Sequence, residues 1–117
     1  MHVVIRKFSH LRSVRAAAQR AETGLAALLT GMPGFLGYYI FDAGDGVGGS
    51  VTFFEDLPSA TLANERAMAW VRASIMDLCD GEPEIITGDV LYWSKAGDDG
   101  LKQPTRPAVP DELGERA

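Results

Sequence analysis

Five side chains in this sequence are suited to stabilising a small organic anion or holding a flat ring: Asn64, Arg6, Tyr38, Tyr39 and Trp70. An amide, a guanidinium and a phenol can each donate hydrogen bonds to an oxygen on which negative charge develops. An indole can form a flat apolar wall beside an aromatic ligand. We therefore take Asn64, Arg6 and Tyr39 as candidate catalytic residues, and Trp70 and Tyr38 as candidate ligand-binding residues.

Each candidate also has a structural interpretation. Asn64 falls near the centre of a predicted apolar helix stripe, where its amide needs either a structural hydrogen bond or a ligand. Arg6 lies inside a predicted strand and either binds a carboxylate or oxyanion, pairs with Asp89, or reaches solvent. Trp70 either packs at the edge of the apolar helix stripe or forms an aromatic wall beside a ligand. Tyr38 and Tyr39 must point to opposite faces of their strand, and the sequence does not say which faces the helices.

Other chemistries lack the residues they need. His2 and His10 do not form a recurring metal-ligand spacing with the acidic residues, so we expect no metal. The sequence contains no Ser-His-Asp or Cys-His pattern, and we expect no cofactor. Cys79 is the only cysteine and is predicted to pack in the core, which is typical of a cytoplasmic protein without disulfides.

The charge and hydropathy of the chain exclude two classes of partner. The net charge of −5 and the pI near 4.9 disfavour nucleic acid and anionic membrane surfaces. The apolar runs are much shorter than the roughly 20 residues of a membrane-spanning helix. We therefore expect neither nucleic acid nor a membrane as a partner.

The elements that would position these residues alternate as strand, helix, strand, strand, helix, strand. The strands are predicted over Val3–Phe8, Phe35–Phe41, Gly48–Glu55 and Ile85–Trp93. The first helix is capped by either Ser9 or Ser13 and carries an apolar stripe from Leu11 to Leu28, and the second helix spans Leu57–Cys79. This β-α-β-β-α-β order predicts an α+β, ferredoxin-like fold: a four-stranded antiparallel sheet with two helices on one face. The turn Asp42–Gly46 is rich in glycine and aspartate and joins the middle strands as a hairpin.

The strands are apolar on both faces, which two helices cannot cover. Val51 and Phe53 would point to one side of the sheet, and Thr52 and Phe54 to the other. Exposing the uncovered face would be costly, at about 25 cal/mol per Å² of apolar surface. We therefore predict a two-fold homodimer through the sheet face, burying more than roughly 1,000 Å².

The domain is expected to span residues 1–94. From residue 95 to 117 the chain is polar and carries prolines at Pro104, Pro107 and Pro110. Such a segment cannot form a core by itself. It is either a flexible tail or an extended arm that lies across the partner subunit.

Over residues 2–94 the chain resembles the dimeric α/β-barrel superfamily, and within it the antibiotic-biosynthesis monooxygenase-like proteins. The segment Met32–Phe35, followed by Gly37, Tyr38 and Tyr39, carries the resemblance together with the order of elements. The resemblance implies pairing into a dimeric α/β barrel and a ligand cleft between the helices and the sheet of each subunit.

The resemblance also implies limits on function. The heme-degrading branch uses a histidine near the end of the second helix, and Ile75–Asp80 has none, which implies no heme. The cofactor-free oxygenases combine an asparagine and a tryptophan on that helix with an arginine on the last strand. Asn64 and Trp70 match with a wider spacing, whereas the last strand has no arginine.

Two functions therefore stay open. One is a cofactor-independent oxygenase acting on a small aromatic compound. The alternative is a non-catalytic homodimer that binds a small apolar or aromatic molecule, or that has a stress-related role.

Overall fold

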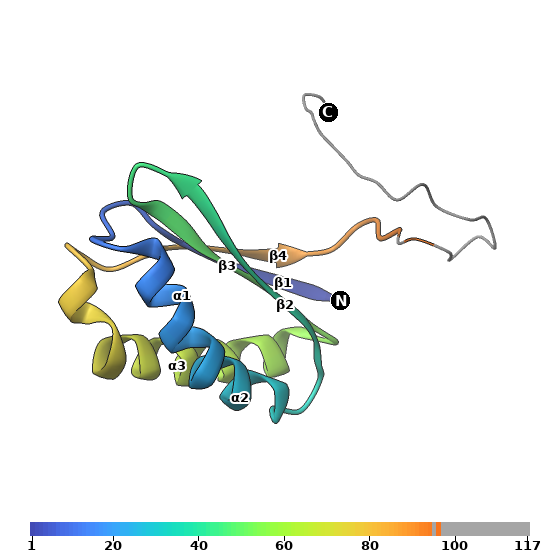
Figure 1. Ribbon diagram of the computed structural model, residues 1–117. Coiled ribbons are helices and arrows are strands. Elements are labelled where there is room, and N and C mark those ends of the chain that lie inside the picture. The colour runs from blue at the N-terminus through green and yellow to red at the C-terminus, as the bar shows by residue number, and fades with distance from the viewer. Residues whose placement is uncertain (95, 97–117) are drawn as a thin grey trace.

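Three α-helices lie on one face of a four-stranded antiparallel sheet in the computed structural model (Figure 1). The structure describes residues 1–94 and 96, so the predicted tail 95–117 lies outside the described residues except for residue 96. The elements are β1 (His2–Phe8), α1 (Val14–Thr23), α2 (Leu25–Thr30), β2 (Phe35–Gly44), β3 (Val47–Phe54), α3 (Leu57–Ser74), a 3₁₀ turn η1 (Met76–Leu78) and β4 (Glu84–Asp89).

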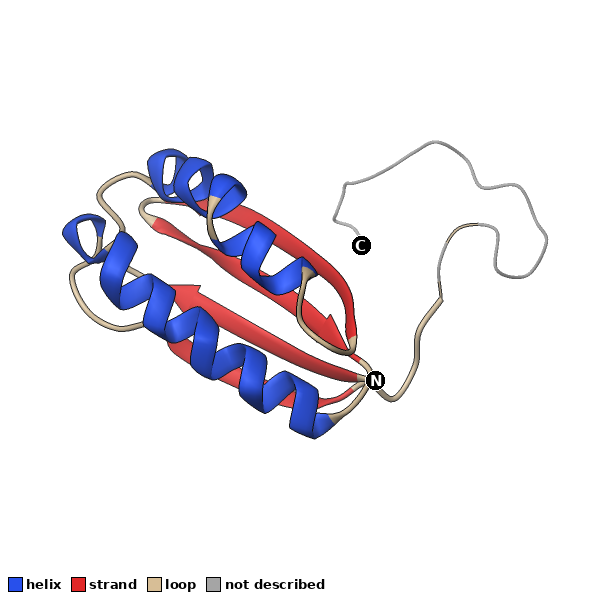
Figure 2. Ribbon diagram, turned by 90° about the horizontal axis from the view of Figure 1, so that it is seen from below, coloured by secondary structure: helices blue, strands red, loops and turns tan. Residues whose placement is uncertain are grey.

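The strand order is β2-β3-β1-β4, with every neighbouring pair antiparallel. This is the arrangement that the sequence predicted, and the ferredoxin-like α+β fold is confirmed. Figure 2 shows all the helices in front of the sheet, so the opposite face of the sheet has no covering layer among the described residues.

The first predicted helix is broken into α1 and α2 at Gly24, which a single apolar stripe did not indicate. The indole of Trp70 packs against this point, and a Cβ on Gly24 would lie 2.7 Å from Trp70 Nε1. The break therefore lets α3 approach the backbone between the two helices closely.

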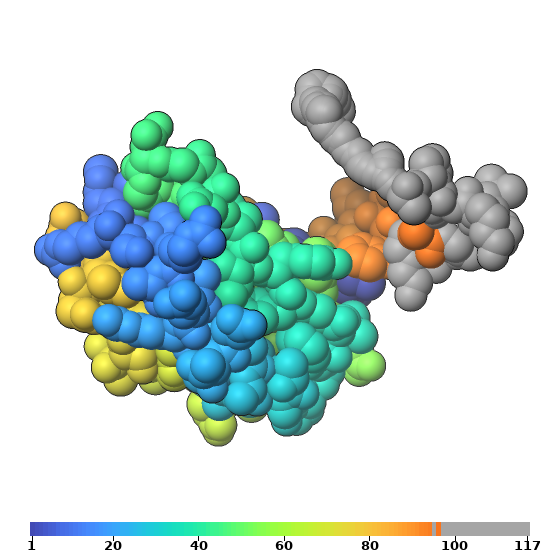
Figure 3. Space-filling view, in the orientation of Figure 1, coloured from blue at the N-terminus to red at the C-terminus, as the bar shows by residue number. Residues whose placement is uncertain are grey.

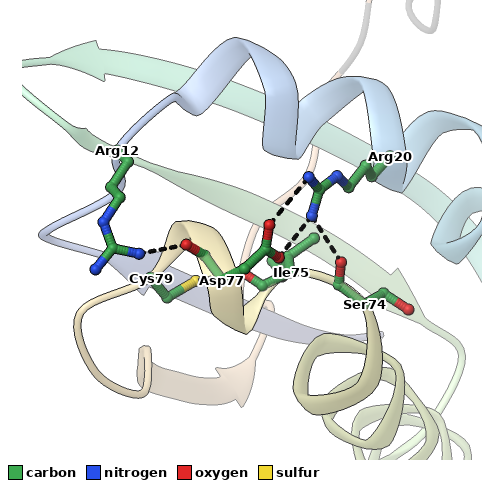
Figure 4. A network of polar contacts seen from close by, with 6 residues as sticks. All are labelled: Arg12, Arg20, Ser74, Ile75, Asp77 and Cys79. Atoms are coloured by element: carbon green, nitrogen blue, oxygen red, sulfur yellow. Dashed lines mark hydrogen bonds and ion pairs between the residues drawn. The ribbon is translucent and has the colours of Figure 1, made fainter.

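The second predicted helix also ends early, because α3 stops at Ser74 and gives way to η1. Arg20 of α1 donates to Asp77 at 2.7 Å and to the Ser74 carbonyl at 3.0 Å (Figure 4). Arg12 donates to the Asp77 carbonyl, and Cys79 Sγ donates to the Ile75 carbonyl at 3.2 Å. These contacts tie α1 to the turn that follows α3.

A β-bulge at Leu36 sets which residues of β2 face the helices. The register passes from Phe35 opposite Phe54 to Gly37 opposite Phe53, which leaves Leu36 as an extra residue. Phe35 and Tyr38 therefore both pack on the helix side, whereas strict alternation would separate them.

The last strand ends at Asp89, four residues before the predicted end at Trp93. Asp89 pairs with His2, which is the first residue of β1. Beyond this pair, β1 therefore has no further residues with which β4 could continue a regular ladder. One further bond joins the Val90 amide to the Met1 carbonyl at 2.9 Å. Trp93 instead packs edge-on against Phe53, with ring centroids 5.3 Å apart.

The core lies between the sheet and the helices. It is built from alternate residues of the strands and from the inner stripe of α3: Val4, Phe8, Phe54, Ala60, Ala63, Ala67, Met68 and Val71. None of the helices in the described part of the chain is both long and apolar enough to cross a membrane.

We predict that Gly49→Ala destabilises the sheet. A Cβ at Gly49 would lie 1.9 Å from the Arg6 carbonyl oxygen, which is backbone and cannot yield without moving β1. The free energy of unfolding in urea should fall by about 2 kcal/mol or more. Gly88→Ala is the matched control in β4, since no atom lies within 4 Å of its Cβ position. Its unfolding should change by less than about 0.5 kcal/mol, and equal effects of the two variants would contradict the prediction.

We also predict a pH-dependent contribution from Asp77. The hydrogen bond from Arg20 holds the pKa of the Asp77 carboxyl below its ordinary value. The ion pair therefore stabilises the fold above the unfolded-state pKa of about 3.9, and its contribution is lost as the pH falls through the lower folded-state pKa.

Asp77→Asn should accordingly lower the thermal midpoint slightly at pH 7, and its difference from wild type should shrink as acid protonates the wild-type carboxylate. Asp45→Asn makes the same charge change in the exposed hairpin turn, where no ion pair forms among the described residues, and serves as the control. A constant offset for Asp77→Asn over this change in pH would mean that the ion pair contributes nothing.

Candidate ligand-binding site

A cavity of about 40 Å³ lies between the sheet, α1 and α3. Most of its lining is aliphatic, from residues such as Leu25, Val71 and Ile75. Its polar groups come from Arg6 of β1, Tyr38 of β2, Ser50 of β3 and Trp70 of α3. The fold thus brings Arg6, Tyr38 and Trp70, which are far apart in the sequence, to one place.

Arg6 is the most unusual of these residues, because its side chain is charged and only 1% exposed. Its Nη1 donates to Ser50 Oγ at 3.1 Å and to Thr52 Oγ1 at 3.3 Å. Its Nε and Nη2 are buried and have no hydrogen-bond partner within the described residues. No carboxylate of the described residues forms an ion pair with Arg6. Two buried nitrogen donors of Arg6 are thus left to bind a ligand.

The pleat of β1 explains why this arginine is buried. Residues His2, Val4, Arg6 and Phe8 are buried under the helices, while Lys7 is exposed on the other side. Arg6 lies in register opposite Ser50, and Thr52 is the next residue of β3 on the same face. The alternative pairing with Asp89 is not formed, because Asp89 accepts from His2 at 3.1 Å instead.

Tyr38 is half-buried on the helix face, opposite Thr52. Burial raises the pKa of the Tyr38 phenol, although the Arg6 charge acts in the opposite direction. Tyr38 is therefore a neutral hydrogen-bond donor at physiological pH. Burial likewise lowers the pKa of the Arg6 guanidinium. Arginine side chains keep their proton in proteins, so Arg6 is positively charged at neutral pH.

Trp70 is half-buried and packs against both apolar clusters of the core as well as lining the cavity. Both interpretations of Trp70 apply in the structure. Its indole packs against the backbone at Gly24, and it also presents an aromatic surface to the cavity.

Tyr39 and Asn64 do not line the cavity that contains Arg6. Tyr39 is 59% exposed on the uncovered sheet face, where its ring packs edge-on against Phe53 at 6.1 Å. Asn64 borders a separate pocket of about 150 Å³ beside Ile85 and Thr87, and its buried Oδ1 has no partner within the described residues. The structure does not bring either residue to the cavity that holds Arg6.

Asn64 lies on the buried side of α3. At about 100° per residue it falls between Val71 and Met68, which are both buried. The residue as a whole is half-buried, because the open pocket beside β4 reaches its side chain.

A surface groove of about 210 Å³ adjoins the cavity along the seam between α1 and β2. Val14, Ala18 and Ile40 line both the groove and the cavity. Figure 3 shows this seam, where the blue side chains of α1 meet the green side chains of β2. The groove and the cavity therefore share a wall at this seam.

Sequence reasoning did not single out Ser50 and Thr52, which hold the Arg6 guanidinium. Their spacing of two residues, which puts two hydroxyls on one face of an apolar strand, was the available signal. It also did not foresee that His2 is buried, with hydrogen bonds to Asp89 and, at 2.7 Å, to Thr87. Over residues 1–94 and 96, no cluster of three His, Cys, Asp or Glu side chains could hold a metal ion.

No protein-family profile matches this sequence, and no curated protein matches it significantly. Solved structures, however, share its fold. A protein of unknown function from Nitrosomonas europaea, NE2512, superposes with a TM-score of 0.67 at 15% identity, covering 80% of this chain and 92% of its own.

Two oxygenases of Streptomyces are also similar. The monooxygenase ActVA-Orf6 of Streptomyces coelicolor, in complex with nanaomycin D, has a TM-score of 0.60 at 17% identity and covers 79% of this chain and 92% of its own. SnoaB of Streptomyces nogalater, a cofactor-independent oxygenase, has a TM-score of 0.63 at 14% identity, covering 79% of this chain and 94% of its own. The structural resemblance to antibiotic-biosynthesis monooxygenase-like proteins is confirmed, and at these identities it shows the fold alone.

We predict that Arg6→Met leaves the protein at least as stable as wild type. Methionine has a similar length, and it removes the cost of burying a guanidinium that has no carboxylate. The free energy of unfolding in urea should stay constant or rise by about 1–2 kcal/mol. Lys7→Met, the exposed neighbour on β1, is the control and should change it by less than about 0.5 kcal/mol. A large loss specific to Arg6→Met would show that the guanidinium is mainly structural.

Proposed function

We propose that this protein is a homodimer whose helix–sheet cavity binds a small aromatic compound and oxidises it with molecular oxygen, without a cofactor. The observation that carries the proposal is the pair Arg6 and Tyr38. A buried cation with free N–H groups and a neutral phenol lie together in an apolar cavity next to an accessible seam. ActVA-Orf6, a monooxygenase solved with nanaomycin D, and SnoaB, a cofactor-independent oxygenase, share the fold, which is consistent with this function.

The reaction suits a hydroxylated aromatic ring. Arg6 binds an anionic group of the substrate. The ring loses a proton to water at the seam and becomes a carbanion, and Tyr38 donates to the oxygen on which negative charge develops. The carbanion passes electrons to O₂. One oxygen atom becomes a carbonyl of the quinone product, and the other leaves as water with the two hydrogens that the substrate loses. The substrate supplies all four electrons, so the balance requires no reductant.

The space at the seam supports an aromatic ligand. A cavity of roughly 150 Å³ is enough to hold benzene. The groove of about 210 Å³ exceeds this, whereas the inner cavity of about 40 Å³ does not. The ring would therefore lie in the groove, with only its polar group reaching the inner cavity.

The uncovered sheet face supports the homodimer. Ile5, Tyr39, Val51, Phe53 and Ile86 share this face. A depression of about 350 Å³ lies on it, lined by residues that include Tyr39, Phe53 and Trp93. A monomer would leave this apolar surface in water, whereas a second copy of the sheet would bury it.

A non-catalytic binding role is the second candidate. The described residues that line the inner cavity include no carboxylate and no histidine, so the cavity itself offers no ordinary general base. Among the described residues of the groove, Asp42 is the one carboxylate. Asn64, one of the candidate catalytic residues, borders a different pocket. Ligand binding without turnover would need only Arg6, Tyr38 and the apolar lining.

Oxygen uptake with 1,5-dihydroxynaphthalene distinguishes the two candidates. The wild type should consume oxygen faster than buffer, and Tyr38→Phe should lower kcat by roughly 10-fold or more through loss of a hydrogen bond to developing charge. Tyr39→Phe, which alters the adjacent residue on the opposite face, is the matched control and should keep the wild-type rate. Asn64→Ala should also keep it. Binding of the compound without oxygen uptake would favour the non-catalytic role.

The homodimer can be tested by sedimentation. The wild type should sediment as a dimer at micromolar concentration, and Ile5→Glu should shift it to monomer because a charge would then be buried between two sheets. Leu62→Glu introduces the same charge on the exposed side of α3 and should leave the dimer intact. A wild type that sediments as a monomer at these concentrations would overturn the dimer.

A further inference from the structure

The free part of the Arg6 guanidinium has a defined shape. Nη1 is already committed to Ser50 and Thr52, and the unpartnered groups are Nε and Nη2. In a planar guanidinium these two nitrogens share one edge, and their N–H bonds point in nearly parallel directions. The unsatisfied feature is therefore a pair of parallel donors rather than two unrelated ones.

This edge is the one that arginine uses to bind carboxylates with two parallel hydrogen bonds. A single phenol oxygen would satisfy only one of the two donors well. The inner cavity of about 40 Å³ is much smaller than the roughly 150 Å³ of a cavity that holds benzene, so it suits a small head group rather than a ring. A phosphate, with its larger and more strongly charged head, would fit this mostly aliphatic lining poorly.

The rest of the ligand must leave the cavity along the seam. Val14, Ala18 and Ile40, which line both spaces, are apolar, and Phe41 extends the apolar surface of the groove. Arg15 and Asp42 at the groove carry opposite charges, so they give no net preference for a second charged group. The surroundings thus fit one charged end and an apolar body.

We propose that the ligand is an apolar, ring-containing monocarboxylate. Its carboxylate binds the Nε–Nη2 edge of Arg6, Tyr38 lies beside the head group, and the ring occupies the seam between α1 and β2. This assignment deepens the proposed function and rests on the ligand entering this cavity. For the oxygenase, it makes the substrate a hydroxylated aryl carboxylate.

The test compares binding of 2-naphthoate with that of its neutral isostere 2-naphthamide, measured by calorimetry on the full chain. The carboxylate should bind wild type roughly 10- to 100-fold more tightly than the amide, since charge-assisted hydrogen bonds replace neutral ones. Arg6→Met should abolish this preference. Arg6→Lys should keep only a small part of it, because an ammonium group lacks the two-pronged edge. Arg66→Met, on the exposed surface of α3, changes the net charge equally and should preserve the preference.

The outcomes separate this inference from the proposed function. Equal affinity for the two compounds, unaffected by Arg6→Met, would overturn the carboxylate assignment and leave aromatic binding intact. Failure of both compounds to bind at millimolar concentration would overturn the cavity as a ligand site, and the assignment with it. A preference for 2-naphthoate in a protein that takes up no oxygen with hydroxynaphthoates would support the assignment and overturn the oxygenase.

Discussion

The burial of Arg6 is the constraint on which the arrangement of the site depends. A guanidinium placed in the middle of a central strand, under a layer of helices, requires polar partners in an otherwise apolar interior. β3 supplies two of them, Ser50 and Thr52, because its register with β1 sets their hydroxyls on the same face. Those two partners satisfy only one nitrogen. The position of the unpartnered Nε–Nη2 edge of Arg6 therefore follows from the register between β1 and β3. The backbone hydrogen bonds of the sheet hold that register in place.

The helices form the other wall of the cavity and are attached to one another at two points. Trp70 packs into the break at Gly24, which joins α3 to the α1–α2 pair at the end of the cavity. One turn earlier in α1, Arg20 binds Asp77 in the turn after α3 (Figure 4). N-terminal to both attachments, α1 meets β2 through small or aliphatic side chains, Val14, Ala18 and Ile40. Opening the seam at these residues would cost mainly apolar contacts.

The sequence was sufficient for the fold, because element order and hydrophobic period specify a ferredoxin-like sheet with few alternatives. It identified Arg6, Tyr38 and Trp70 as candidates but could not bring them together. That step depends on the register between β1 and β3 and on the bulge at Leu36, neither of which leaves a periodic signal. Asn64 lies among the buried residues of α3, yet it borders a different pocket, because its side of the helix faces Ile85 and Thr87 of β4. A helical wheel predicts which residues of a helix are buried but not which strand each of them faces.

Tyr38 and Tyr39 are joined by a single peptide bond, yet one borders the ligand cavity and the other lies on the uncovered sheet face. Under the functions proposed above, Tyr38 and Tyr39 would be under different selection pressures. Position 38 would vary among related proteins with the chemistry of the ligand, while position 39 would vary with the surface of the partner subunit. Ligand preference and dimer assembly would then evolve independently, although the two residues that affect them are adjacent in the sequence.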